Sequence, residues 1–119
     1  MVESVERSEK FYSDVLGFSE VMSVPGESGK IFSMITRDEV NIMLQTMASF
    51  VKDNASFSKT KIGGSILLYI DVQKIDEVYA SVKKNNVKLY KDMHETFYGT
   101  KEFHILDPDG YLIGFAEDQ

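Results

Sequence analysis

Two segments of the chain carry apolar residues at the spacing of an amphipathic helix. In residues 75–84 these positions follow the pattern i, i+3, i+4 and i+7, as Ile75, Val78, Tyr79 and Val82. In residues 4–16 they fall on a similar stripe, as Val5, Phe11, Tyr12 and Val15. Glycine and asparagine follow the two segments, and both residue types end helices. The pattern predicts two helices, each with one face to bury.

Seven shorter runs are rich in β-branched and aromatic residues, which favours strands. They cover residues 18–24, 31–35, 40–45, 65–71, 87–90, 102–106 and 111–116. Turn-forming sequences lie at residues 25–29 and 107–110, where proline, glycine and aspartate suit the backbone angles of tight turns. Helices mixed with hairpins predict an α+β fold, and 119 residues are enough for one domain but too few for two.

The chain also repeats itself. A shift of 71 residues lays Lys30 on Lys101 and Phe32 on Phe103 without a gap, and the helix ahead of each hairpin matches at a shift of 67. Each half therefore reads as a helix followed by three strands. A strand, residues 65–71, also precedes the second helix, whereas only three residues precede the first. This predicts a duplicated βαβββ unit whose first strand is truncated, either because the natural start lies upstream or because the N-terminal edge is frayed.

Three segments resemble a known family: the helix sequence of residues 7–18 (RSEKFYSDVLGF), the pair Tyr98-Gly99, and the turn of residues 107–111 (DPDGY). They are similar to signatures of the vicinal oxygen chelate superfamily of glyoxalases, bleomycin-resistance proteins and extradiol dioxygenases, in its bleomycin-resistance-like branch. The resemblance implies module one at 1–48, a linker at 49–62 and module two at 63–119. It further implies a curved mixed sheet around a cavity, with the helices on its convex face, and a homodimer.

Strand periodicity predicts which side chains face that cavity. Ile66, Leu68 and Ile70 alternate as a uniformly aliphatic set, so they are expected against a helix. The same alternation turns the remaining residues of three strands inward: Ser65, Leu67, Tyr69, Asn41, Met43, Gln45, Leu112, Gly114 and Ala116.

The positions at which the family's enzymes hold a metal fall on Met43, Ser65 and Gly114 in this chain. A thioether, a hydroxyl and a missing side chain are poor ligands for a hard or borderline divalent ion. We therefore expect no catalytic divalent metal and no cofactor. A site built from the only two histidines, His94 and His104, with a nearby glutamate stays as an alternative.

Four residues are candidates for direct ligand contact or catalysis. Alternation places Glu102 and His104 on the cavity side, where an imidazole beside a carboxylate suits a general base or a hydrogen-bonding partner; the alternative is a partly exposed sheet residue. Tyr98 suits stacking on a planar or cationic ligand, or else a place in the core. His94 lies in the polar stretch 91–96, which reads as a surface loop.

Met43, Met47, Phe50 and Phe57 lie in or beside the linker. The linker is expected either to cover the cavity as an adaptable flap or to serve ordinary packing or a dimer contact. The Gly63-Gly64 pair is too short to cradle a phosphate and reads as a turn.

The net charge and the absence of cysteine argue against several classes of function. The net charge is −6 and there is no cysteine, which disfavours binding to nucleic acid or anionic lipid and excludes thiolate chemistry. No leader or membrane-spanning segment is visible, so a cytoplasmic location is expected.

The first hypothesis is a metal-independent protein that sequesters an apolar or cationic small molecule. Its predicted ligand-binding residues are Asn41, Met43, Ser65, Leu67, Tyr69, Tyr98, Glu102, His104, Leu112 and Gly114. The second is an enzyme of the same fold, a lyase, isomerase or glutathione-dependent transferase, that uses His104 with Glu102 or an unrecognised metal. A third is an accessory interaction domain without a cavity.

Overall fold

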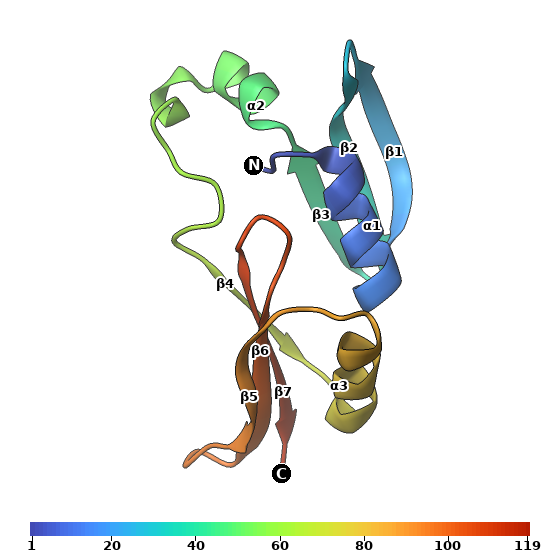
Figure 1. Cartoon of the computed structure of the whole chain (residues 1–119), viewed down its shortest axis with the longest axis vertical. Coiled ribbons are helices and arrows are strands. Elements are labelled where there is room, and N and C mark those ends of the chain that lie inside the picture. The colour runs from blue at the N-terminus through green and yellow to red at the C-terminus, as the bar shows by residue number, and fades with distance from the viewer. The chain divides into compact units, whose positions relative to one another are not determined.

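The computed structural model describes residues 1–119 and divides into two compact units, Met1–Gly63 and Gly64–Gln119 (Figure 1). The division falls within the predicted Gly63-Gly64 turn. None of the helices has the length and apolar content needed to cross a bilayer.

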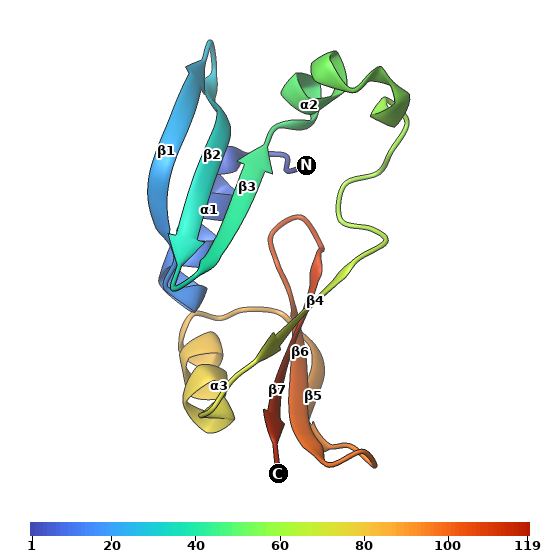
Figure 2. The ribbon, with the colours of Figure 1, turned by 180° about the vertical axis from the view of Figure 1, so that it is seen from behind.

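The first unit is a three-stranded antiparallel sheet with a helix on one face. Its elements are α1 (Val5–Leu16), β1 (Ser19–Gly26), β2 (Gly29–Arg37), β3 (Val40–Gln45), α2 (Met47–Asp53) and the 3-10 helix η1 (Ala55–Phe57). The strands follow the order β1-β2-β3, and Figure 2 shows the sheet with α1 behind it. The hydroxyl of Ser4 accepts a hydrogen bond from the backbone N–H of Arg7 at 3.2 Å and so begins α1.

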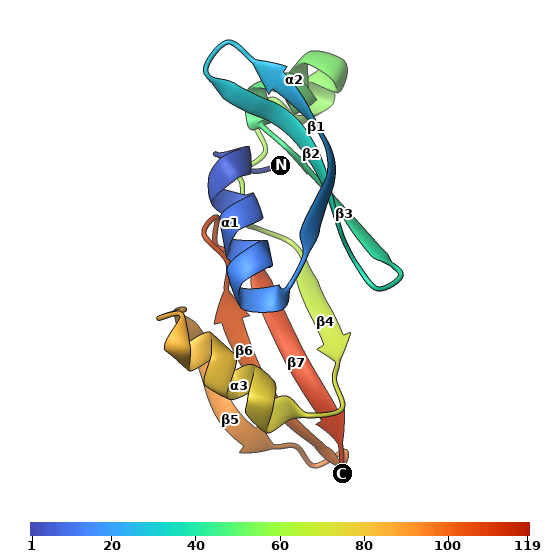
Figure 3. The same cartoon turned by 90° about the vertical axis from the view of Figure 1, so that its right-hand side faces the viewer.

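The second unit is a four-stranded mixed sheet with α3 on one face (Figure 3). Its elements are β4 (Leu67–Asp71), α3 (Ile75–Lys84), β5 (Leu89–Glu95), β6 (Thr100–Leu106) and β7 (Leu112–Asp118). The strand order is β4-β7-β6-β5, with β4 parallel to β7 and the other pairs antiparallel.

The duplicated βαβββ pattern is present in the two units. In the first unit, Val2 forms a single parallel bridge to Thr46, and its N–H donates to the carbonyl of Gln45 at 2.9 Å. Val2 thus lies beside the end of β3 in the way that β4 lies beside β7. This single bridge takes the place that the five-residue strand β4 has in the second unit. The α+β fold of two βαβββ modules is confirmed.

The gap-free alignment of the two halves is wrong for β2. Ser33 and Ile35 are the buried residues of that strand, whereas the buried aliphatic and aromatic positions of β6 on the helix side are Phe103 and Ile105. The shift of 71 would have matched Phe32 with Phe103, on opposite faces. Measured between equivalent pairs, Ile35 with Ile42 and Ile105 with Ile113, the β2–β3 hairpin is one residue shorter than the β6–β7 hairpin. A one-residue slip exchanges the faces of a strand.

Three further boundaries differ from the predicted ones. Pro25 and Gly26 complete β1 rather than opening the turn, and β5 runs on to Glu95, so His94 lies in a strand instead of a loop. The predicted strand stops short of the observed end of β5 because the pairing of β5 with β6 shifts register twice, which breaks the period-2 pattern of polar and apolar residues. The predicted linker includes most of α2 and all of η1, in which the rings of Phe50 and Phe57 pack edge to face at 5.3 Å.

The start of β4 also lies later than predicted. Ser65 precedes the strand, is exposed, and has a left-handed backbone with φ of 71°. Ile66 likewise precedes the strand and is 53% exposed, so it does not pack against a helix. The alternation that placed these two residues therefore holds only from Leu67 onward.

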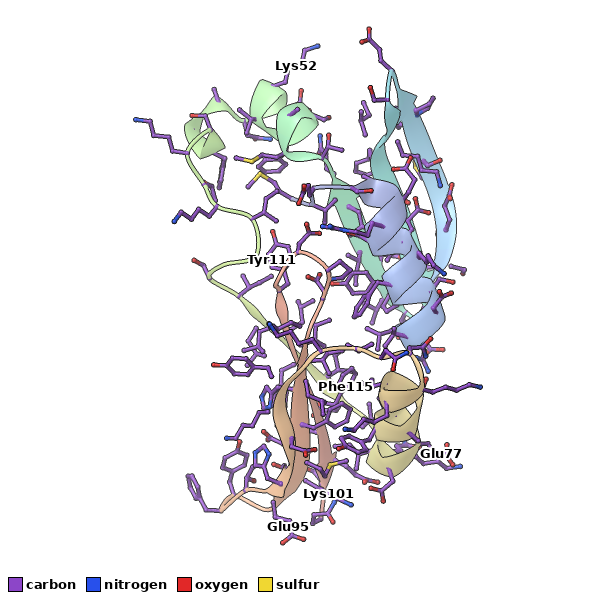
Figure 4. All side chains as sticks on the ribbon, viewed as in Figure 1. Lys52, Glu77, Glu95, Lys101, Tyr111 and Phe115 are labelled. Atoms are coloured by element: carbon purple, nitrogen blue, oxygen red, sulfur yellow. The ribbon has the colours of Figure 1, made fainter.

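The core of the second unit lies between its sheet and α3. Phe103 and Phe115 stack with ring centroids 4.9 Å apart, and Tyr79 of α3 packs edge-on against Phe103 at 5.1 Å. Ile75 and Val82 of α3 are fully buried. Phe115 can be found on the ribbon in Figure 4. This apolar layer supports the opposite face of the sheet.

Candidate functional site

The candidate site is the face of the β4–β7 sheet that points away from α3, called here the open face of the second unit. Strand pairing sets Tyr69 and His104 on either side of Gly114, and sets Glu102 beside Ala116. Leu67 pairs with Leu112 on the same face. Six of the predicted ligand-binding residues thus lie together: Leu67, Tyr69, Glu102, His104, Leu112 and Gly114.

Two of the predicted ligand-binding residues, Asn41 and Met43, belong to the first unit. They are on β3, on the side of its sheet away from α1, where Met43 is 63% exposed. Ser65 belongs to the second unit but lies ahead of β4, outside the strand.

Glu102 is the centre of the open face. It is only 3% exposed, and its Oε1 accepts three hydrogen bonds, from the hydroxyls of Tyr69 at 2.6 Å, Thr100 at 2.7 Å and Tyr98 at 2.9 Å. Thr100 shares a face with Glu102 because the two are separated by one residue in β6. Tyr98 reaches the carboxylate from the β5–β6 turn, where Gly99 adopts a φ of 90° that favours glycine.

These hydrogen bonds keep Glu102 ionised. Burial by itself would raise the pKa of this carboxyl, but the hydroxyls of Tyr69, Thr100 and Tyr98 outweigh burial and lower the pKa below its usual range. The same contacts, led by the bond to Glu102, raise the pKa of Tyr69 to about 12 and also raise that of Tyr98. Both tyrosines therefore remain protonated donors at neutral pH.

The two tyrosines that bond the buried carboxylate of Glu102 also reach the surface. Tyr69 is 47% and Tyr98 58% exposed, while the carboxylate beneath them is sealed from solvent. An aromatic ring attracts cations through its negative face. A planar cation resting on these rings would also feel the negative charge of Glu102.

His104 forms a pair with His94. Their rings are nearly parallel, at 16°, with centroids 6.2 Å apart. The Nδ1 atom of His94 lies 2.8 Å from the carbonyl oxygen of Asp92 and so carries a proton, whereas Nδ1 of His104 is buried without a hydrogen-bond partner. Burial lowers the pKa of His104 although the charge of Glu102 opposes the change. His104 is thus a neutral imidazole beside an ionised carboxylate.

Sequence reasoning identified Glu102, His104 and Tyr98 on this face, but it assigned His94 to a surface loop and joined it to His104 only in an alternative metal site. The signal for His94 was the pairing of β5 with β6, in which His94 lies opposite Glu102. That pairing depends on register and is not readable from the polar stretch alone.

Gly114 provides the space in which the His104 ring lies. A Cβ atom at this position would come within 2.9 Å of both Cδ2 and Nε2 of His104. We expect Gly114→Ala to displace the imidazole and return its pKa toward the ordinary value near 6.5, because the ring becomes better hydrated. NMR titration of the two histidine rings measures this. Gly64→Ala is the control, since no atom lies within 4 Å of its added Cβ; unchanged His104 signals in Gly114→Ala would refute the expectation.

The residues at the family's metal positions do not fit a divalent metal. Met43 offers a thioether, Ser65 an exposed hydroxyl outside the sheet, and Gly114 no side chain. The structure also contains no group of three or more His, Asp or Glu side chains arranged to hold a metal ion.

We expect the protein, purified without an affinity tag, to bind Zn²⁺, Ni²⁺, Mn²⁺ and Fe²⁺ at far less than one equivalent. The physical reason is the lack of carboxylate or imidazole donors at the three positions. Elemental analysis followed by titration with each ion checks this. Near-stoichiometric binding that His104→Ala abolishes would contradict it.

Comparisons with known proteins agree with this fold. The sequence profile of the Glyoxalase/Bleomycin resistance protein/Dioxygenase superfamily matches residues 1–115, whereas no curated protein sequence matches the chain. A family enzyme from Burkholderia phytofirmans PsJN is 20% identical, with TM-score 0.82 over 99% of this chain and 93% of that one.

Two further solved structures share the fold at low sequence identity. TnmS3, an antibiotic binding protein from Streptomyces sp. CB03234, is 20% identical with TM-score 0.72 over 96% of this chain and 86% of its own. TioX from Micromonospora sp. ML1 is 11% identical with TM-score 0.77 over 99% and 93%. Identities this low show a shared fold alone. Because the family profile covers nearly all of the chain, this protein belongs to the Glyoxalase/Bleomycin resistance protein/Dioxygenase superfamily.

Proposed function

We propose that this protein binds a small planar, cationic molecule on the open face of the second unit and releases it unchanged. One observation carries the proposal: Glu102 is a buried, ionised carboxylate whose charge is covered by two half-exposed tyrosines. TnmS3, an antibiotic binding protein, has the same fold, which supports a binding role without naming a ligand for this chain.

Three interactions favour a planar cation on this face. A cation over a tyrosine ring gains about 0.5–2 kcal/mol, more as water is excluded. The negative charge of Glu102 adds an attraction that solvent screens weakly, because the carboxylate is buried. Leu67, which is 47% exposed on the same face, offers apolar surface to the rest of the ligand.

The experiment compares planar probes of opposite charge. Proflavine carries a positive charge and anthraquinone-2-sulfonate a negative one; bleomycin is added because the superfamily name refers to it. Calorimetry and thermal unfolding should show that proflavine binds and stabilises the protein, since a ligand at about 100 times its Kd adds about 2.7 kcal/mol to the unfolding free energy. Equal binding of the two planar probes, or binding of neither proflavine nor bleomycin, would refute the proposal.

A second candidate is catalysis by His104. The observation in its favour is the buried, unpartnered Nδ1 of a neutral imidazole beside Glu102, an arrangement suited to proton abstraction. If this candidate holds, a bound ligand is recovered chemically altered from wild type but unaltered from His104→Gln. Mass spectrometry of the recovered ligand distinguishes the two functions.

We also expect a homodimer. Large apolar side chains are exposed in each unit, among them Val21, Val40, Met43, Ile66 and Phe97, and open sheet edges favour pairing or cover. Sedimentation at micromolar concentration should show twice the chain mass of 13.5 kDa. A species of 13.5 kDa alone would contradict this.

A further inference from the structure

His94 lies on the open face of the second unit, in strand β5 and directly opposite Glu102. Two contacts mark this face: the hydroxyl of Thr100 donates to Glu102 at 2.7 Å, and the hydroxyls of Thr96 and Thr100 lie 2.7 Å apart. One residue separates His94 from Thr96, so in an extended chain their side chains point to the same side. Opposed residues have Cβ atoms about 4.5–5.5 Å apart. The imidazole of His94 therefore borders the carboxylate that the tyrosine hydroxyls bond.

The two ring nitrogen atoms of His94 differ in their hydrogen bonding. Nδ1 lies 2.8 Å from the carbonyl oxygen of Asp92, and a carbonyl only accepts, so Nδ1 carries the proton of the neutral ring and Nε2 keeps a lone pair. Nε2 makes no hydrogen bond within the protein. It is also not one of the buried atoms without a partner, which are Oγ of Ser33 and Nδ1 of His104. Nε2 of His94 is therefore an unpaired acceptor that a ligand can reach.

A free acceptor beside the tyrosine rings favours one kind of cation. A planar cation with N–H groups at its edge can lie against the rings and donate to Nε2 of His94, and hydrogen bonds that involve a charged group are stronger than neutral ones. A cation whose nitrogen atoms are fully alkylated has no donor. It would take water away from Nε2 without replacing the hydrogen bond, and a site that bonds an N–H group rejects such an analogue.

We propose that His94 makes the open face selective for planar cations that carry an N–H donor at their edge, such as aromatic amines and amidines, and that Nε2 accepts the hydrogen bond. The inference rests on the proposed binding function of this face. It adds to that function a class of ligand and the residue that selects it.

The test compares proflavine with 10-methylacridine orange, which has the same three-ring core and a single positive charge but no N–H group. Calorimetry is done at about pH 8, where an ordinary histidine is neutral. Wild type should bind proflavine at least about tenfold more tightly, the effect expected for one hydrogen bond to a charged group. Equal affinities, or a preference for the methylated cation, would overturn this inference and leave the proposed function standing. Binding of neither cation would refute planar-cation binding as well.

Two variants separate hydrogen bonding from ligand size. His94→Phe keeps an aromatic ring but has no acceptor, so proflavine affinity should fall at least about tenfold, while affinity for the methylated cation stays unchanged. Tyr90→Phe is the matched control: it removes one polar group from an exposed residue of the same strand and should bind both cations as wild type does. A proflavine preference that survives in His94→Phe would come from the size of the methyl groups and would overturn the proposal.

Nitrogen NMR of protein labelled with ¹⁵N-histidine tests the hydrogen bond without any substitution. In the free protein, Nδ1 of His94 should carry the proton and Nε2 should be bare. Proflavine should shift the Nε2 signal toward that of a hydrogen-bonded nitrogen and leave Nδ1 protonated, whereas 10-methylacridine orange should not. A proton on Nε2 of free His94, or an unshifted Nε2 signal at saturation with proflavine, would overturn the proposal.

Discussion

Replacing Phe103 by alanine is expected to lower the free energy of unfolding by about 3–5 kcal/mol, the range for large aromatic side chains removed from a core. Phe103 is fully buried. Its ring stacks on Phe115 at 4.9 Å and receives the edge of Tyr79 at 5.1 Å. The substitution therefore leaves a cavity between the sheet and α3 and removes two aromatic contacts, each worth about 0.5–1.5 kcal/mol beyond burial.

Urea unfolding followed by circular dichroism measures this loss. Phe97→Ala is the matched control, because the side chain of Phe97 is 100% exposed and its removal should change stability by less than about 0.5 kcal/mol. Equal effects of the two substitutions would show that the apolar layer beneath α3 does not hold the second unit together.

Replacing Glu102 by glutamine is expected to weaken proflavine binding at least about tenfold, a loss of about 1.4 kcal/mol. Glutamine keeps an oxygen that can accept the hydroxyls of Tyr69, Tyr98 and Thr100, but it removes the charge. A cation on the tyrosine rings lies roughly 8 Å from the carboxylate, because the hydroxyls stand between them, and a pair of unit charges at that distance near a protein surface is worth about 2 kcal/mol. Affinity for anthraquinone-2-sulfonate should stay weak, so the ratio of the two affinities is the quantity to measure by calorimetry.

The same substitution should change the response of the fold to acid. The folded pKa of Glu102 lies below its ordinary value of 4.5, so ionised Glu102 stabilises the fold above pH 4.5, and this contribution is lost as the pH falls through the folded pKa. Because hydrogen bonds to a charged group contribute about 1.5–3 kcal/mol each and neutral ones about 0.5–1.5, Glu102→Gln should be less stable than wild type at about pH 7. The difference should shrink below about pH 4.

Glu95→Gln is the control for both measurements. Glu95 is an exposed carboxylate at the end of β5, so its neutralisation should leave proflavine affinity and acid stability nearly unchanged. If Glu95→Gln weakens proflavine binding as much as Glu102→Gln, the attraction comes from overall negative charge and not from the buried carboxylate.

Elements whose signals are local could be predicted from the sequence. The helical spacing of residues 4–16 and 75–84 and the residues that stop each helix predicted α1 and α3 within a residue, and β3 was predicted at its observed bounds. The family signatures predicted the superfamily, and the internal repeat predicted the duplicated pattern. Alternation also placed Leu67, Tyr69, Leu112 and Gly114 on one face, because the side-chain period of a strand is fixed by its backbone geometry.

How these faces combine depends on contacts made in the folded protein. The residues facing α1 from β2 depend on a one-residue difference in a hairpin turn, and the place of His94 beside His104 depends on the shifted pairing of β5. Tyr69 meets Glu102 although the two are 33 residues apart in the chain. Strand register arises from contacts between segments distant in sequence, so a change of one residue exchanges the faces of a strand without changing any local pattern.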